Sequence, residues 1–128
     1  MRIHDIMESV EQTLEAIGNK TSVKDAVTAM FRKKAHALLV TDKSGNLVGI
    51  ITERDIARAL GEHGKDAAML PVSEIMSLDL VICQPDQSAQ EALSMMGKNQ
   101  VRNLPVVADN GHMLGVVGIM ELVQSVLN

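Results

Sequence analysis

The stretch from Thr52 to Asp55 reads Thr-Glu-Arg-Asp and brings a hydroxyl, a guanidinium and carboxylates together between an apolar run and an apparent helix. An ionised carboxylate accepts hydrogen bonds from hydroxyl groups, and a Thr hydroxyl with the free amides that open a helix can receive an anion. Thr52 can equally cap the helix, with Glu53 and Asp55 as ordinary acids of its first turn. The local sequence supports a binding site and a capped helix start equally.

The chain contains an internal repeat, which tests these two interpretations. A shift of 66 residues gives a gapless match that begins near Thr13 and ends near Leu60. Its identical pairs include Ser22 with Ser88, Ala26 with Ala92, Met30 with Met96, Leu38 with Leu104, Val40 with Val106, Gly45 with Gly111, and Gly49 with Gly115. The pair Ile6-Met7 also recurs before the second copy, as Ile75-Met76. Each copy is too small to bury a sheet alone, so the pair is predicted to be the folding unit.

The elements that must position these groups follow the same order in both copies. Apolar residues at helical spacing after a Ser cap predict an amphipathic helix over 22–34. Two apolar runs around a Gly-containing turn predict a β-hairpin over 37–52, and a second helix is expected from Asp55 to about Leu60. The second copy repeats these elements over 88–96, 104–118 and 121–127. A short strand is predicted at Thr13 to Ile17, although a helix closed by Gly18 is the alternative there.

The composition limits the classes of protein to which the chain can belong. Its 128 residues are 46% hydrophobic, which is enough for one compact domain or for two small halves sharing a core. A net charge of -4 argues against general binding to nucleic acid, which needs an excess of cations. Phe31 is the single aromatic residue, so stacking on nucleic-acid bases is also excluded.

Few residues suit catalysis or metal binding. The four histidines and Cys83 show neither metal-ligand spacing nor a nucleophile and base pattern, so we expect no enzyme and no metal site. Cys83 lies in an apolar run and is interpreted as a buried strand end. The sequence has no signal-peptide run and no segment of about 20 apolar residues, so we expect a cytoplasmic protein without a membrane partner.

The two copies in register resemble a tandem pair of cystathionine β-synthase (CBS) domains, also called a Bateman module. The residues that carry the likeness are "LLVTDKSGNLVGIITERDI" and "VRNLPVVADNGHMLGVVGIMEL". The resemblance implies an α+β fold of two β-α-β-β-α units related by a pseudo-two-fold axis. It places the first unit, with an N-terminal lead segment, at residues 1–66 and the second at residues 67–128.

The resemblance also implies a ligand site in the cleft between the units. The family's phosphate and ribose motif falls on Gly49, Thr52 and Asp55, with Arg54 beside them. Asp55 would accept the ribose hydroxyls, while Thr52 and the amides of the helix start would receive a phosphate. A basic residue near the phosphate is expected at His36 or Arg102, of which the guanidinium of Arg102 is the better candidate. The purine would lie in an apolar slot formed by Ile50, Met76, Val81 and Val101.

The second copy has lost most of these polar groups. Gly118, Met120 and Glu121 stand where the first copy has Thr52, Arg54 and Asp55. Without the hydroxyl, and with a longer carboxylate that loses more rotamer entropy when it is fixed, the second cleft is expected to be weak or empty. This contrast favours a ligand site over a plain helix cap in the first copy.

The resemblance implies a stand-alone regulatory or sensor protein with no obligatory cofactor. Its expected ligand is an adenine nucleotide such as AMP, ADP or ATP, or S-adenosylmethionine. A homodimer is expected, because Ile56, Leu60, Leu122 and Val126 give the last helix of each copy an apolar stripe. An unidentified regulated protein is a further possible partner. The alternative is a dimerisation or interaction module without nucleotide binding, since function varies widely on one fold.

Overall fold

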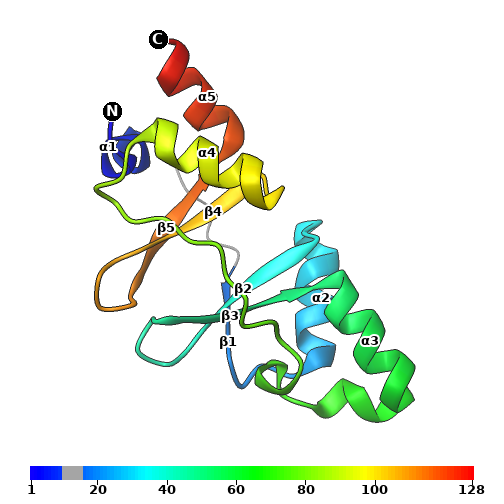
Figure 1. Cartoon of the computed structure of the whole chain (residues 1–128). Coiled ribbons are helices and arrows are strands. Elements are labelled where there is room, and N and C mark those ends of the chain that lie inside the picture. Colours follow the sequence, from blue (N-terminus) through cyan, green and yellow to red (C-terminus); the bar gives the residue numbers. More distant parts are fainter. Residues whose placement is uncertain (10–15) are drawn as a thin grey trace. The chain divides into compact units, whose positions relative to one another are not determined.

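The computed structural model describes residues 1–9 and 16–128 (Figure 1). It divides into two compact units, each with its own core. The central unit comprises residues 15–80, and the terminal unit comprises residues 1–14 and 81–128. The predicted division at residue 66 concerns the two repeats and stays a prediction. In the described residues, the packing groups 67–80 with the first repeat and 1–9 with the second.

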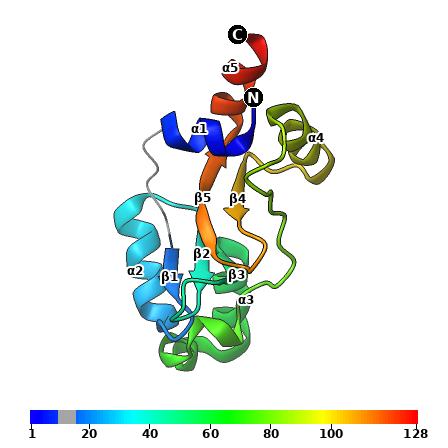
Figure 2. The same cartoon turned by 90° about the vertical axis from the view of Figure 1, so that its left-hand side faces the viewer.

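The central unit has the predicted β-α-β-β-α order (Figures 1 and 2). Its elements are β1 (Ala16–Gly18), α2 (Val23–Lys33), β2 (Ala37–Thr41), β3 (Leu47–Thr52) and α3 (Glu53–His63), followed by the 3-10 turns η1 (Gly64–Met69) and η2 (Val72–Glu74). The sheet order is β1-β2-β3, with β1 parallel to β2 and β2 antiparallel to β3. Ser22 caps α2 as predicted, because its side chain accepts a hydrogen bond from the amide of Asp25. The core lies between the sheet and the two helices.

The start of helix α3 differs from the sequence-based expectation. Helix α3 begins at Glu53 rather than at Asp55, because Thr52 is its N-cap and the first turn therefore includes Glu53 and Arg54. Residues 16 and 17 lie in strand β1, as predicted, but the rest of the predicted strand from Thr13 lies outside the described residues.

The terminal unit repeats the plan with a shorter first strand. Its elements are α1 (Ile3–Ser9), α4 (Ala89–Asn99), β4 (Asn103–Val107), β5 (Met113–Gly118) and α5 (Ile119–Leu127). Strands β4 and β5 form an antiparallel hairpin, and Cys83 forms a single parallel bridge with Val106 in the place of a first strand. Cys83 is buried, as expected, and burial raises the pKa of its thiol to about 11.

The segments that precede the repeats pack on opposite units. Ile3 and Ile6 are buried in the core of the terminal unit, although they precede the first repeat in sequence. Ile75 and Met76, which precede the second repeat, pack instead against the core of the central unit. Each unit therefore completes its core with a segment that lies next to the other repeat in the sequence.

The helices are short: the longest of those in residues 1–9 and 16–128 has 11 residues. Across this described part of the chain, no helix has both the length and the apolar character needed to cross a membrane.

Candidate functional site

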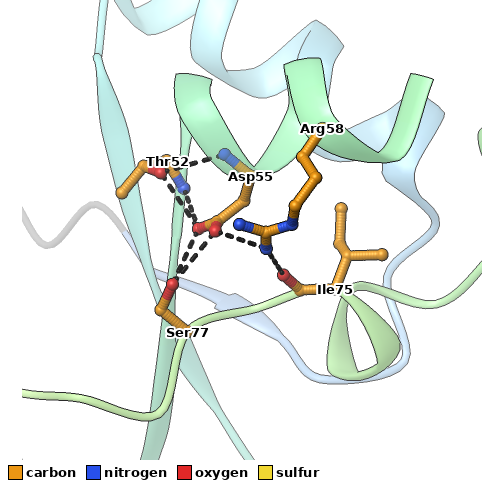
Figure 3. Close-up of polar contacts among 5 residues, drawn as sticks. All are labelled: Thr52, Asp55, Arg58, Ile75 and Ser77. Carbon is orange, nitrogen blue, oxygen red and sulfur yellow. Dashed lines mark hydrogen bonds and ion pairs between the residues drawn. The ribbon is translucent and has the colours of Figure 1, made fainter. Parts of the chain in front are cut away.

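Asp55 lies at the junction of β3 and α3, where a reciprocal capping box fixes it (Figure 3). Thr52 ends the strand with an extended backbone, and its hydroxyl oxygen accepts a hydrogen bond from the Asp55 amide at 3.2 Å. In return, the Asp55 carboxylate accepts the Thr52 amide at 3.0 Å. The predicted helix cap is therefore present, and it binds the carboxylate that the sequence analysis proposed as a ligand acceptor.

The Asp55 side chain is almost fully buried, with a relative exposure of the residue of only 2%. It accepts three further hydrogen bonds besides the backbone one, because a buried carboxylate needs donors in place of water. The Thr52 hydroxyl lies 3.0 Å from Oδ2, and the Arg58 guanidinium donates to Oδ1 at 2.9 Å. The Ser77 hydroxyl lies 3.0 Å from Oδ1 and 3.2 Å from Oδ2, so it faces both carboxylate oxygens (Figure 3).

Ser77 reaches Asp55 because the chain after η2 runs along the outer edge of β3. Ser77 and Ile50 exchange two backbone hydrogen bonds, of 2.8 and 3.0 Å, which fix the register of this contact. Gly49 makes the close approach sterically acceptable: a Cβ there would lie 2.9 Å from the Met76 Cγ. Arg58 adds a second link, since its guanidinium also donates to the Ile75 carbonyl at 3.4 Å. The segment Ile75–Ser77 is thus attached to both β3 and α3.

Opposing effects act on the pKa of Asp55. Burial by itself would raise the pKa, because the ionised form loses its water. The hydrogen bonds from Thr52, Ser77 and Arg58 outweigh this effect and hold the pKa below its ordinary value of 3.8. The site therefore contains an ionised carboxylate at neutral pH, surrounded by hydroxyl, amide and guanidinium donors.

Other residues predicted for the site also lie in the central unit. Ile50 and Met76 are both half-buried. Ile50 on β3 pairs with Ser77, and the Met76 side chain lies against Gly49 of the same strand. Arg54 is exposed on the first turn of α3. The exposed His36 pairs its Nδ1 with a carboxylate oxygen of Glu53 at 3.0 Å.

The amides of the α3 start differ from the expectation that they would be open to an anion. The Glu53 amide donates to the His36 carbonyl at 3.2 Å, and the Asp55 amide donates to Thr52. Both amides are therefore already engaged. A phosphate near this helix start would have to rely on cationic side chains such as Arg54 rather than on these two groups.

Three predicted site residues belong to the terminal unit. Val81 and Val101 are partly buried against its core, and Arg102 is exposed while its carbonyl accepts the Ile119 amide at 2.9 Å. The predicted site thus draws on both units, and the assembly of these residues with Asp55 into one site stays a prediction.

The equivalent helix start in the second copy is built differently. Gly118 is the N-cap of α5 and provides no side-chain cap. The Glu121 carboxylate folds back over it, so that a Cβ at position 118 would lie 2.9 Å from a carboxylate oxygen. Met120, the counterpart of Arg54, is 60% exposed. Glu121 is half-buried, whereas Asp55 is the buried charged residue among those that the structure describes.

Sequence reasoning missed Arg58 and Ser77, the partners of Asp55 that lie outside the capping box. Arg58 follows Asp55 by three positions on the same helix, a spacing at which side chains meet, so this contact had a sequence signal. Ser77 is 22 residues away from Asp55 and directly follows the recurring Ile-Met pair, which marks the segment without indicating its contact. Within residues 1–9 and 16–128 there is no group of three or more His, Cys, Asp or Glu residues that could hold a metal ion.

The two units together define a tandem pair of CBS domains. The chain matches the CBS domain family over residues 3–62 and 72–128, and it therefore belongs to this family. It is 32% identical over 120 residues to the CBS domain-containing protein YhcV of Bacillus subtilis, a match that covers 91% of this chain and 84% of YhcV. By contrast it spans only 20% of an inosine-5'-monophosphate dehydrogenase from Nitrosopumilus maritimus, to which it is 33% identical.

Solved structures share the fold. A CBS domain pair in complex with 5'-methylthioadenosine and S-adenosyl-L-methionine matches 98% of this chain and 95% of its own, with a TM-score of 0.73 and 24% identity. The protein CBSX2 in complex with AMP matches 98% of this chain and 96% of its own, with a TM-score of 0.78 and 22% identity. At these identities the likeness shows the fold.

The Asp55 network should dominate the pH dependence of stability in acid. Asp55→Asn removes the charge and points an amide donor at groups that are themselves donors, so we expect a loss of about 1 to 3 kcal/mol at pH 7. The pKa of Asp55 is lower in the folded than in the unfolded chain, so its contribution is complete above the ordinary value of 3.8 and is lost as the pH falls through the folded-state pKa. Urea unfolding at a series of pH values measures this.

The wild-type advantage over Asp55→Asn should therefore shrink below about pH 4. Asp79→Asn, at an exposed position, is the matched control and should change stability little at any pH. A constant difference between the wild type and Asp55→Asn down to the acid limit would contradict the assignment of the ionised carboxylate.

Proposed function

We propose that the chain is a regulatory CBS pair that binds an adenosine-containing ligand, of the AMP, ADP or ATP class or S-adenosylmethionine, through Asp55. The observation that carries this proposal is a nearly buried, ionised carboxylate that is met by a hydroxyl group, the hydroxyl of Ser77, on both of its oxygens. The hydroxyls of a ribose are the same kind of donor as the Ser77 hydroxyl. Asp55 is thus suited to accept a ribose.

The fold relatives support the choice of ligand class. The CBS pair solved with 5'-methylthioadenosine and S-adenosyl-L-methionine, and CBSX2 solved with AMP, hold compounds that share an adenosine. The carboxylate of Asp55 is proposed to accept hydrogen bonds from the ribose, which all these compounds contain. Apolar contacts from Ile50 and Met76, and from Val81 and Val101 of the terminal unit, are proposed to enclose the purine.

The cations near the helix start are proposed to contact the phosphate or another anionic group. Arg54 is exposed beside Thr52, and Arg102 is exposed in the terminal unit. A guanidinium binds phosphate with two parallel hydrogen bonds, whereas the imidazole of His36 already pairs with Glu53. We therefore assign the main phosphate role to Arg54 and Arg102 and a secondary one to His36.

A catalytic role is not part of this proposal. Cys83 is buried with a raised pKa, which leaves little thiolate to act as a nucleophile. His36 lies at the surface, and its imidazole pairs with the carboxylate of Glu53 rather than with a nucleophile. We propose a non-catalytic sensor, and its cytoplasmic location stays a prediction.

Binding of the ribose by Asp55 predicts an asymmetry between the two copies. Asp55→Ala leaves two ligand hydroxyls without their charged partner, a loss on the order of 1.5 to 3 kcal/mol, or roughly ten- to a hundredfold in affinity. Glu121→Ala, the matched change in the second copy, should alter the affinity little. Isothermal titration calorimetry with AMP, ADP, ATP and S-adenosylmethionine measures both, and a melting curve of each apo variant separates lost binding from lost stability.

Two results would contradict this function. Absence of calorimetric binding and of a thermal shift with every one of these compounds at millimolar concentration would exclude an adenosine sensor. Loss of binding in Glu121→Ala but not in Asp55→Ala would place the ligand in the second copy instead.

A second proposal, a homodimer, rests on an apolar groove on the central unit. The groove between α2 and α3 has a volume of about 660 Å³. Its apolar lining includes Val27, Phe31 and Leu60, with exposures of 37%, 87% and 44%. Of the residues expected at the dimer contact, Leu60 and Val126 are exposed, whereas Ile56 and Leu122 are buried and contribute to the cores of their units. Ile56 also lines the groove. This surface also supports the alternative function of a dimerisation module without a ligand.

If the groove forms the dimer contact, a charged substitution in it should lower the molecular mass of the protein in solution. Leu60→Glu places a carboxylate in the apolar contact, and we expect it to convert dimers into monomers at tens of micromolar protein. Leu78→Glu, at an exposed position outside the helices, is the control and should leave the mass unchanged. Analytical ultracentrifugation gives the masses, and a monomeric wild type at the same concentration would contradict the proposal.

A further inference from the structure

The acceptor capacity of Asp55 is already used in full. An ionised carboxylate offers about four lone-pair positions for hydrogen bonds. Four donor hydrogens already occupy these positions: the amide and hydroxyl of Thr52 on Oδ2, Arg58 on Oδ1, and the Ser77 hydroxyl, which lies within hydrogen-bond distance of both oxygens. The hydroxyls of a ribose therefore cannot be added to this set. At least one of the present donors has to leave when the ligand binds, and each departure frees a position for one ribose hydroxyl.

Ser77 is the donor whose departure costs least. The Thr52 contacts are the capping box of α3, so losing them would open the helix start. Arg58 is charged, and its hydrogen bond to a carboxylate is of the stronger, charge-assisted kind. Ser77 is a neutral hydroxyl whose side chain can rotate while its two backbone bonds to Ile50 persist.

The position of the Ser77 hydroxyl also matches that of the incoming group. It lies 3.0 Å from Oδ1 and 3.2 Å from Oδ2, so a ribose hydroxyl in the same place could donate to either carboxylate oxygen. Ligand and Ser77 therefore compete for one place on the carboxylate, like for like.

Resting on the proposed function, we propose that Ser77 is an internal competitor that occupies the ribose position of Asp55 in the free protein and sets the affinity for ribose-containing ligands. In the free protein the hydroxyl satisfies the buried charge and fastens the segment Ile75–Ser77, which leads to the terminal unit. When a diol binds, the Ser77 hydroxyl turns away and this side-chain contact is released. Ligand binding is thereby coupled to the loss of the Ser77–Asp55 hydrogen bond, which helps to fix the segment that leads to the terminal unit.

Removing the competitor should tighten binding. Ser77→Ala removes the hydrogen bond to Asp55 that stabilises the free protein. It should not destabilise the complex, because Ser77 does not contact Asp55 there. We expect calorimetry to give an AMP affinity about tenfold higher than that of the wild type. Ser73→Ala is the matched control: it makes the same chemical change at an exposed position in the preceding turn η2, and its affinity should equal that of the wild type. Ser77→Thr keeps the hydroxyl and should also bind as the wild type does.

A ligand without the diol separates this effect from a general loosening of the site. With 2',3'-dideoxy-AMP, the wild type and Ser77→Ala should bind equally. The preference for AMP over this analogue should accordingly be about tenfold in the wild type and about a hundredfold in Ser77→Ala. Melting curves of the free proteins check that every variant is folded, and the AMP preference of the wild type alone tests the proposal if Ser77→Ala is not.

The outcomes distinguish the competitor from the function on which it rests. The competitor proposal is overturned if Ser77→Ala binds AMP no more tightly than the wild type does. It is also overturned if the wild type prefers AMP over the dideoxy analogue by far more than a hundredfold. In both cases the proposed adenosine site stands. An equal gain for AMP and the dideoxy analogue also overturns the competitor proposal. If no protein of the set binds AMP, the proposed function fails for AMP and the competitor fails with it.

Discussion

The burial of one charge is the constraint on which the architecture around the candidate site depends. A carboxylate with a residue exposure of 2% is strongly unfavourable unless donors replace its lost water. Three parts of the central unit supply them: the end of β3 through Thr52, the second turn of α3 through Arg58, and the following segment through Ser77 (Figure 3). Thr52 and Arg58 are close to Asp55 in the sequence, whereas Ser77 is 22 residues away, so the charge connects the junction of strand and helix to a segment that follows much later in the chain.

The comparison of the two repeats shows what this charge adds to a shared fold. Both copies form the hairpin and the flanking helices, and Ser22 and Ser88 cap corresponding helices with the same hydrogen bond. At the next helix start the copies separate, because Gly118 has no side chain to cap α5 and the half-buried Glu121 folds over it. The fold therefore tolerates loss of the Thr-Asp capping box, which means that folding alone does not require Asp55 in the first copy. This argues for a role beyond structure.

Much of the fold could be predicted from the sequence, because local sequence signals mark each helix and strand and the same signals occur in both repeats. Ser caps, helical spacing of apolar residues and the hairpin glycines at 45 and 111, which adopt positive φ, each recur at the same offset. The packing of Ile3 and Ile6 on the terminal unit could not be predicted, since short segments carry no periodicity that names their partner. Asp55 could be found as a candidate because its motif is local. Its pairing with Ser77 joins residues 22 positions apart, and no pattern in the sequence indicates that contact, so it required the structure.

The central claim, that Asp55 is an ionised carboxylate held by hydroxyl donors, is tested most directly by its own titration. Carbon-detected nuclear magnetic resonance of protein labelled at aspartate gives the pKa from the chemical shift of the Asp55 carboxyl carbon. The account predicts a pKa below 3.8 in the wild type and a higher value in Ser77→Ala, because one donor to the ionised form is lost. A wild-type pKa at or above 3.8, or a value that Ser77→Ala leaves unchanged, would contradict it.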